Sequence, residues 1–282
     1  PDLWEAGTSG LNTQNYLSGG ANGRNIITYN PANGLGARGV PFLWGNLNST
    51  QQDALNRNPS NVLDANGPAR LDYLRGASIN EGANLNFRSR VCYDINGAVL
   101  ATCPADVGKL GDIINSSAAY VGKPIFDYPD TLEPVTYSSF RTAQTGRTAM
   151  VYVGANDGML HGFRADNGLE EIAYVPNLVY TNDATNNLSL LTWQSYTHRY
   201  YVDGTPTIGD VFYGGTWHTM LVGGLRKGGR GYFALDITNP TVLTESNANN
   251  IARWEFTDPD LGYSFSQATI VKVADSTGTG SP

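Results

Sequence analysis

Short apolar runs separated by turn residues dominate the second half of the chain. Met150–Gly154 is a β-branched and aromatic run, and Asn156-Asp157-Gly158 follows with residues that tolerate the left-handed backbone of a hairpin turn. Met159–Arg164 predicts a returning strand, Asp166-Asn167-Gly168 a second reversal, and Glu171–Val175 a third strand. Such closely spaced antiparallel strands form a meander, which is the unit that β-propellers repeat.

A second copy of this pattern follows the first, and a first strand precedes each copy. The matching segments are Asn115–Gly122 and Gly204–Val211, Met150–Gly154 and Met220–Gly224, Gly162–Asp166 and Gly231–Asp236, and Glu171–Val175 and Arg253–Phe256. Phe265–Val271 resembles the first strand of a third blade. The repeat predicts an all-β fold, a decorated β-propeller with short helical insertions. A sandwich built from hairpins is the alternative.

A long insertion, Asn177–Val202, makes the spacing of the copies unequal. It carries more apolar and aromatic side chains than a solvated loop needs. We expect a partner-binding surface here, formed by Trp193, Tyr196, Tyr200 and Tyr201. The alternative is that the insertion folds down on its own blade.

The first part of the chain has a different pattern. Ser49–Asn56 and Ala69–Gly76 have the capping residues and helix formers of short helices, and Arg24–Tyr29 predicts a strand. We therefore divide the chain into a lead-in segment, residues 1–109, and the first blades of a propeller, residues 110–282, whose ring is incomplete in this chain. One hypothesis is that the lead-in strand closes the ring by pairing with the last blade.

Two cysteines, Cys92 and Cys103, flank a segment whose Asn96-Gly97 dipeptide is a strong hairpin signal. A strict two-residue turn would pair Cys92 with Ala101, so a bulge or a longer loop is needed to align the sulfurs. We expect a disulfide, because the chain has the composition of an exported protein. The alternative is two unpaired thiols, and a zinc site would lack ligands.

The composition is typical of an extracellular or periplasmic β protein. Only 15% of the 282 residues are charged, Gly numbers 33 and the net charge is -7. An acidic chain without a basic stripe does not favour nucleic acid, and we interpret the one basic cluster, Arg226–Arg230, as a solvated loop. No apolar run approaches the roughly 20 residues that span a bilayer. The start at Pro1 without a signal segment suggests a mature or excised fragment.

No catalytic or metal-binding constellation is evident in the sequence. A serine-hydrolase elbow motif is missing, and the histidines are too dispersed to predict a shared metal, at His161, His198 and His218. The acidic residues of the repeats fall where turns are needed, at Asp157, Asp166 and Asp236. The sequence therefore favours a scaffold over an active site.

Four motifs in a fixed order resemble one protein family. They are Leu110–Ser117, Tyr152–Phe163, His198–Thr207 and Gly228–Asp236. Together they look like the C-terminal propeller of the PilY/PilC type IV pilus tip proteins. Parts of the lead-in segment also resemble that family, at Arg24–Tyr29, Gly39–Phe42 and Asp72–Gly76.

This resemblance implies a secreted, non-enzymatic protein of the pilus tip and outer cell surface, exported through the periplasm. Such a protein is expected to promote pilus assembly, oppose retraction, and support adhesion and twitching motility. The implied partners are minor pilins of the tip complex and a host or abiotic surface. No cofactor is expected within this chain, whereas the family's calcium loop is expected in the full-length protein, outside this segment.

A second resemblance leads to an alternative function. The stretch Val151–Phe163 also resembles the blade repeat of pyrroloquinoline-quinone dehydrogenases. Those enzymes need calcium, a Trp floor under the quinone and a catalytic Asp, and many carry a vicinal Cys pair. The chain has no vicinal Cys pair, and none of its Trp or Asp residues lies in a matching motif. A quinone-dependent dehydrogenase is therefore the alternative to a binding protein.

Overall fold

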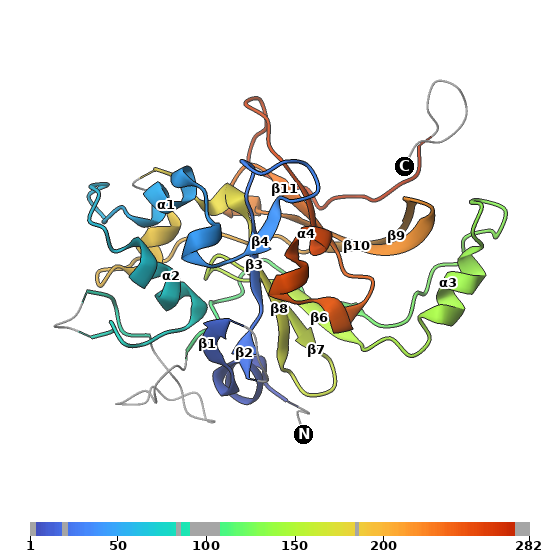
Figure 1. Ribbon diagram of the computed structural model, residues 1–282, viewed down its shortest axis with the longest axis horizontal. Helices are drawn as coiled ribbons and strands as arrows, with labels where there is room; N and C mark the ends of the chain where they lie inside the picture. The colour runs from blue at the N-terminus through green and yellow to red at the C-terminus, as the bar shows by residue number, and fades with distance from the viewer. Residues whose placement is uncertain (1–3, 19–21, 83–85, 91–107, 184–185, 274–282) are drawn as a thin grey trace.

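The computed structural model describes residues 4–18, 22–82, 86–90, 108–183 and 186–273. Two large β-sheets form its centre, and the α-helices are short (Figure 1). These helices are α1 (Ser49–Leu55), α2 (Gly67–Arg75), α3 (Tyr137–Ala143) and α4 (Ala248–Ile251). The first two lie at the left of Figure 1 and α3 projects at the right. None of the described helices has the length and hydrophobicity needed to cross a membrane.

The first sheet contains the first predicted repeat, which we call blade 1. It is an antiparallel meander of β5 (Ala119–Val121), β6 (Met150–Gly154), β7 (Leu160–Arg164) and β8 (Glu170–Val175). The lead-in segment extends this sheet, because β3 (Ile26–Tyr29) pairs in parallel with β8, and β4 (Gly39–Pro41) pairs with β3. A separate small sheet joins β1 (Asn15–Ser18) and β2 (Gly23–Arg24).

The second sheet is the second predicted repeat, which we call blade 2. It is a meander of β9 (Thr207–Tyr213), β10 (Thr216–Gly224), β11 (Tyr232–Asp236) and β12 (Ala252–Phe256). Its register repeats that of blade 1: Gly154 pairs with Leu160, and Gly224 pairs with Tyr232. From this register, the irregularities at Gly162/Phe163 and at Ala234/Leu235 fall at equivalent positions. The predicted repeat of strands is therefore confirmed.

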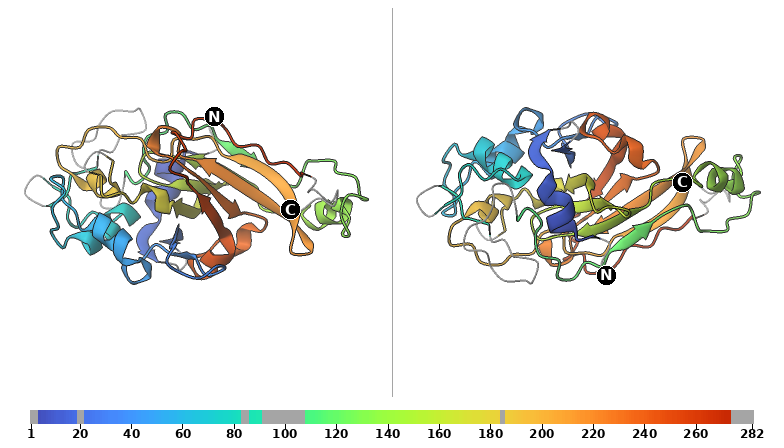
Figure 2. Two further views of the ribbon diagram at one scale, coloured as in Figure 1. Left: turned by 90° about the horizontal axis from the view of Figure 1, so that it is seen from above. Right: turned by 90° about the horizontal axis from the view of Figure 1, so that it is seen from below.

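The two blades pack against each other around one hydrophobic core, and Figure 2 shows the sheets side by side. Tyr152 and Tyr174 of blade 1 and Phe233 of blade 2 belong to this core. Close packing explains Gly162, since a Cβ at this residue would lie 2.7 Å from the Tyr152 ring.

Helix α3, an insertion between β5 and β6 of blade 1, is attached to blade 2. The Tyr137 hydroxyl donates to Asp210 Oδ2 at 2.5 Å, and Trp217 Nε1 donates to the carbonyl of Val135 at 2.7 Å. Tyr137, Phe140 and Trp217 form an aromatic cluster around these bonds. The insertion therefore bridges the two blades.

The predicted helices of the lead-in segment are confirmed. Asn48 caps α1, with its side chain accepting from the Gln51 amide in a capping box. Gly76 ends α2 with a φ of +126°, a conformation that favours glycine.

Three predictions about strands need correction. The lead-in strand is present, but β8 and β4 occupy both of its edges, so the hypothesis that it pairs with the last blade is wrong for this structure. The strand predicted at Asn115–Gly122 shortens to Ala119–Val121. Phe265–Val271 is not a strand, because none of the described residues forms a hydrogen-bonded ladder with it. Instead, Ile270 packs against the face of blade 2.

Candidate partner-binding surface

The apolar half of the insertion Asn177–Val202 belongs to the protein core. Leu188, Leu190 and Leu191 are at most 3% exposed and lie in or next to the short 3-10 helix Leu188–Thr192. Asn187 caps this helix by accepting from Ser189 N at 3.0 Å, and donates to the Ala54 carbonyl of α1 at 2.8 Å. This half of the insertion therefore folds down onto the protein, as the alternative interpretation expected.

Tyr201, one of the four residues proposed for a partner surface, is fully buried. Its hydroxyl donates to the Asn187 carbonyl at 3.1 Å, and its amide donates to Asn156 Oδ1 at 3.0 Å. These bonds join the C-terminal end of the insertion to its middle and to the β6–β7 turn. The prediction that Tyr201 lies on an exposed surface is therefore corrected, because its ring fills the core.

The other three aromatic residues lie at or near the surface. Trp193 is 36% exposed, while Tyr196 and Tyr200 are half-buried. The Arg88 guanidinium lies 4.1 Å from the Tyr196 ring centre, and Lys227 Nζ lies 4.6 Å from the Tyr200 ring centre. These cation–π contacts fix the rings without covering them completely. Their role in partner binding stays a prediction.

The lead-in segment holds this surface in place. Arg88 donates from Nε to the Leu191 carbonyl at 2.6 Å, and its amide donates to the Thr192 carbonyl at 3.0 Å. His198 Nε2 lies 2.6 Å from Asp112 Oδ2, and its ring meets Tyr200 edge-on. Contacts to backbone carbonyls and to neighbouring loops reduce the side-chain entropy lost on binding. The surface is therefore preorganised.

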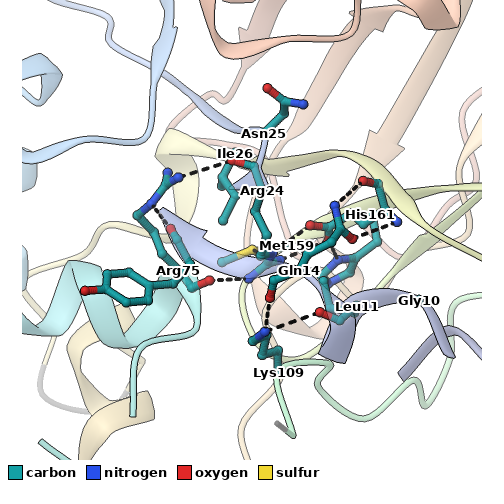
Figure 3. Close-up of polar contacts among 12 residues, drawn as sticks. Gly10, Leu11, Gln14, Arg24, Asn25, Ile26, Arg75, Lys109, Met159 and His161 are labelled. Carbon is teal, nitrogen blue, oxygen red and sulfur yellow. Dashed lines mark hydrogen bonds and ion pairs between the residues drawn. The ribbon is translucent and has the colours of Figure 1, made fainter. Parts of the chain in front are cut away.

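A buried ionic network joins the lead-in segment to blade 1 and was not predicted (Figure 3). Arg24 and Glu170 form an ion pair at 2.6 Å, and both side chains are fully buried. His161 Nδ1 lies 2.6 Å from Glu170 Oε1, and His161 Nε2 lies 3.0 Å from Asp157 Oδ2. Burying any one of these charges without its partner would cost free energy of folding, so the residues of the network have to come together as a unit.

The network reaches both blades. Arg75 pairs with Glu245 at 2.8 Å, and Glu245 precedes the outer strand of blade 2. Arg24 and Arg75 are connected, since Arg24 Nη1 donates to the Arg75 carbonyl at 2.7 Å. Lys109 donates to the carbonyls of Leu11 and Gln14 beside them (Figure 3). The lead-in segment is therefore bonded to Glu170 of blade 1 and to Glu245 of blade 2.

The pKa shifts of His161 and Glu170 keep both of these side chains charged at neutral pH. Burial alone would lower the pKa of His161, but Asp157 and Glu170 raise it above its usual range. Burial alone would raise the pKa of Glu170, but Arg24 and His161 lower it. Because each charge is neutralised by a fixed partner, the arrangement is that of a structural network.

The acidic turn residues serve the turns as expected. Asp157 Oδ1 accepts from Met159 N at 3.1 Å, and Asp236 Oδ1 accepts from Thr238 N at 3.0 Å. Asp166 pairs with Arg164 at 3.0 Å. In the part of the chain that the structure describes, no group of three or more His, Cys, Asp or Glu side chains could hold a metal ion. Cys92 and Cys103 lie outside the described residues, so their disulfide stays a prediction.

Sequence patterns could not reveal the ionic network. Arg24 and Glu170 are 146 residues apart, and neither stands in a charged motif. The available signal was His161, a titratable residue between the apolar residues Leu160 and Phe163 of β7, which had to find polar partners once it was buried.

Comparisons with known proteins agree with the family resemblance that the motifs predicted. A family model described as "PilY1 beta-propeller domain" matches residues 110–278. The type IV pilus biogenesis factor PilY1 of Pseudomonas aeruginosa strain PAK is 42% identical over 265 residues, which cover 91% of this chain and 20% of that protein. A PilY1 homolog of Xylella fastidiosa is 38% identical over 76% of this chain and 14% of its own length.

A solved structure is also similar. The crystal structure of the Pseudomonas aeruginosa PilY1 C-terminal domain is 41% identical, with a TM-score of 0.43, and the match covers 55% of this chain and 29% of that one. The chain spans 20% of the length of these curated PilY1 proteins of Pseudomonas aeruginosa. The family match confirms the predicted class of decorated β-propeller.

Proposed function

This chain belongs to the PilY1 β-propeller family, and we propose that it is a segment of a type IV pilus biogenesis factor that acts by binding. The observation that carries the proposal is the 42% identity to a type IV pilus biogenesis factor over 91% of the chain. The structure supports a binding role because it presents aromatic side chains on a scaffold held by buried ion pairs.

In this proposal the protein works at the pilus tip, on the extracellular side of the outer cell surface. It promotes pilus assembly, opposes retraction, and supports adhesion and twitching motility. Its partners are minor pilins of the tip complex and a host or abiotic surface. Calcium binds the full-length protein through ligands outside this segment.

We assign no enzymatic activity to this chain. The acidic residues of the repeats have structural partners, since Asp157 bonds the turn and His161, and Asp236 bonds the next turn. Incubating the full-length protein with pyrroloquinoline quinone and calcium tests this assignment. Quinone absorbance together with dye reduction would contradict it.

The candidate surface can be tested by capture of the pilus tip complex. We expect the double substitution Trp193→Ala/Tyr200→Ala in the full-length protein to weaken capture of minor pilins and reduce surface piliation. Tyr196 is left unchanged because it packs against the core. The free energy of unfolding of the domain, measured by urea denaturation, should stay within about 0.5 kcal/mol of the parent.

A matched control removes two exposed aromatic side chains from strands outside the insertion. Trp254→Ala/Tyr120→Ala removes a Trp that is 42% exposed and a Tyr that is 68% exposed, away from the insertion. Capture should be unchanged by this control. Equal loss of capture in both double variants would argue against a specific role for the insertion.

A further inference from the structure

The glycine-rich hairpin between β10 and β11 places three cations on three aromatic rings. The Arg226 guanidinium lies 5.6 Å from the Phe265 ring centre, and the Arg230 guanidinium lies 5.7 Å from that of Tyr263. Lys227 Nζ lies 4.6 Å from the centre of the Tyr200 ring. We call these six residues the cation–aromatic surface. The sequence alone had suggested a solvated loop at this position.

The aromatic rings of this surface are held outward by the residue between them. Ser264 is 4% exposed, whereas Tyr263 and Phe265 are 56% and 54% exposed. Ser264 Oγ donates to the Gly231 carbonyl at 2.9 Å and accepts from Leu225 N at 3.2 Å. The Ser264 amide also donates to the Gly229 carbonyl at 3.2 Å. A buried hydroxyl thus fastens two exposed rings to the hairpin.

Arg226 occupies a strained backbone position. Its φ is +52°, in the left-handed region that favours glycine, although glycines stand two and three residues later in the same hairpin. A side chain there costs about 1 kcal/mol. The guanidinium reaches the surface from this position, 3.8 Å from Asp203 and over Phe265. Strain that presents a surface cation is typical of a binding site.

The cation–aromatic surface is continuous with the candidate partner surface. Tyr200 belongs to both, and Arg88 over Tyr196 repeats the same pairing at 4.1 Å. The chain as a whole has a net charge of -7, so this concentration of cations stands out against an acidic background. A partner that approaches here meets fixed positive charges and exposed rings together.

We propose that this surface binds an acidic polypeptide segment in which carboxylates alternate with apolar side chains. The inference rests on the proposed function and names the chemistry of the partner. Guanidinium forks match carboxylates in two-point hydrogen bonds, and rigid exposed rings accept apolar side chains at little entropic cost. An acidic polypeptide carries carboxylates and apolar side chains at short, regular intervals along its backbone, so it can contact the cations and the rings together.

The probe is a fluorescein-labelled peptide with a repeating Glu-Gly-Leu sequence. The test measures its binding to the full-length protein. We expect Lys227→Ala/Arg230→Ala to weaken binding about tenfold. Binding to the parent protein should weaken as NaCl rises from about 0.05 to 0.5 M. A peptide with Lys in place of Glu should not bind.

The matched control removes two charges elsewhere. Arg141→Ala/Arg253→Ala changes the net charge equally, and Arg253 also lies over an aromatic ring, Tyr213, at 5.2 Å. Its binding should stay within about twofold of the parent. An equal loss in both double variants would mean unspecific attraction by charge and would overturn the proposal.

A variant that should tighten binding, rather than weaken it, provides a further test. Asp258 and Asp260 lie on the exposed loop that leads to Tyr263, so Asp258→Asn/Asp260→Asn should tighten binding of the acidic peptide. Heparin serves as the competing anionic polysaccharide. Tighter binding of heparin than of the peptide, at the same surface, would overturn the assignment to a polypeptide.

Failure of this inference and failure of the proposed function can be told apart. If Trp193→Ala/Tyr200→Ala abolishes capture of the tip complex while Lys227→Ala/Arg230→Ala leaves capture and peptide binding intact, only the acidic-partner inference fails. If neither double variant affects capture, the binding role of the whole surface fails.

Discussion

The two blades have the same backbone register and bulge position but different chemistry at equivalent positions. His161 of blade 1 stands where blade 2 has Phe233, and Glu170 stands where blade 2 has Ala252. Conversely, blade 2 has Glu255 where blade 1 has Ala173. The register is thus compatible with either an ionic or an apolar interior.

What covers each blade explains this difference. The lead-in segment lies over blade 1 and brings Arg24, which requires an acidic partner once it is buried. Glu255 of blade 2 instead receives Tyr174 Oη at 2.6 Å and the Asn177 amide at 2.7 Å, both from blade 1 or its insertion. The buried charged residues of each blade therefore depend on the segment that packs against it.

The largest effect should come from breaking the network of blade 1. Glu170→Ala leaves Arg24 and His161 buried without their shared carboxylate and should lower the free energy of unfolding by about 3–5 kcal/mol. Urea denaturation measures the loss. Glu171→Ala is the control, since Glu171 pairs with Arg164 only at 3.9 Å and should cost less than about 1 kcal/mol.

A triple variant tests the comparison directly. Arg24→Met/His161→Phe/Glu170→Ala gives blade 1 the apolar chemistry of blade 2 and should recover part of the stability lost in Glu170→Ala. If the triple variant is less stable than the single one, the register would not tolerate both chemistries.

The buried carboxyl of Glu255 in blade 2 should make the free energy of unfolding depend on pH. Burial, only partly offset by the Tyr174 and Asn177 donors, raises the pKa of Glu255 from 4.5 to about 8. Below pH 4.5 the group is protonated in the folded and unfolded chains. As pH rises toward 8 the unfolded chain loses the proton first, so this group lowers stability through that window, and the loss is complete above it.

Glu255→Gln keeps the shape of the side chain and removes the ionisation. We expect it to raise the free energy of unfolding at pH 8 by about 1–3 kcal/mol and to have little effect at pH 4. Melting curves at both pH values measure this difference. Asp127→Asn, at a side chain that is 99% exposed, is the control. A gain of equal size at both pH values would contradict the assignment to Glu255.

A smaller effect is expected where α3 joins the two blades. Tyr137→Phe removes the hydroxyl that donates to Asp210 at 2.5 Å and leaves a buried carboxylate with one partner fewer, at a cost of about 1–2 kcal/mol. Thr219 still donates to Asp210 at 2.6 Å, which limits the loss. Urea denaturation of Tyr128→Phe, which removes a hydroxyl in the same aromatic cluster, is the comparison. An equal or larger loss there would mean that the bond from Tyr137 to Asp210 has no particular weight.

The smallest effect on the free energy of unfolding should be a gain in stability, whereas the disrupting substitutions above lower it. Arg226→Gly relieves a φ of +52° and should raise stability by up to about 1 kcal/mol, while it weakens binding of the acidic peptide. Melting temperature and peptide affinity are measured on the same sample. Loss of stability with unchanged affinity would mean that Arg226 serves the hairpin alone.

Local patterns predicted those parts of the fold that depend on local chemistry. Met150–Gly154 and Met220–Gly224 formed strands because their turns and β-branched residues act over a few positions. The partner of β3, the burial of Tyr201 and the pairing of Arg24 with Glu170 depend on contacts between distant segments. The sequence located the insertion, but only the structure separated its buried from its exposed aromatic residues.

The parallel pairing of β3 with β8 has a consequence for synthesis. Thr28 precedes its hydrogen-bond partner Val175 by 147 residues, and all four residues of β3 are buried in the final fold. During translation this apolar strand is made long before its neighbour exists, and loops of this length close slowly. Until β8 emerges, β3 is an open template for aggregation, so a chaperone that binds the first part of the nascent chain should improve the yield of folded protein.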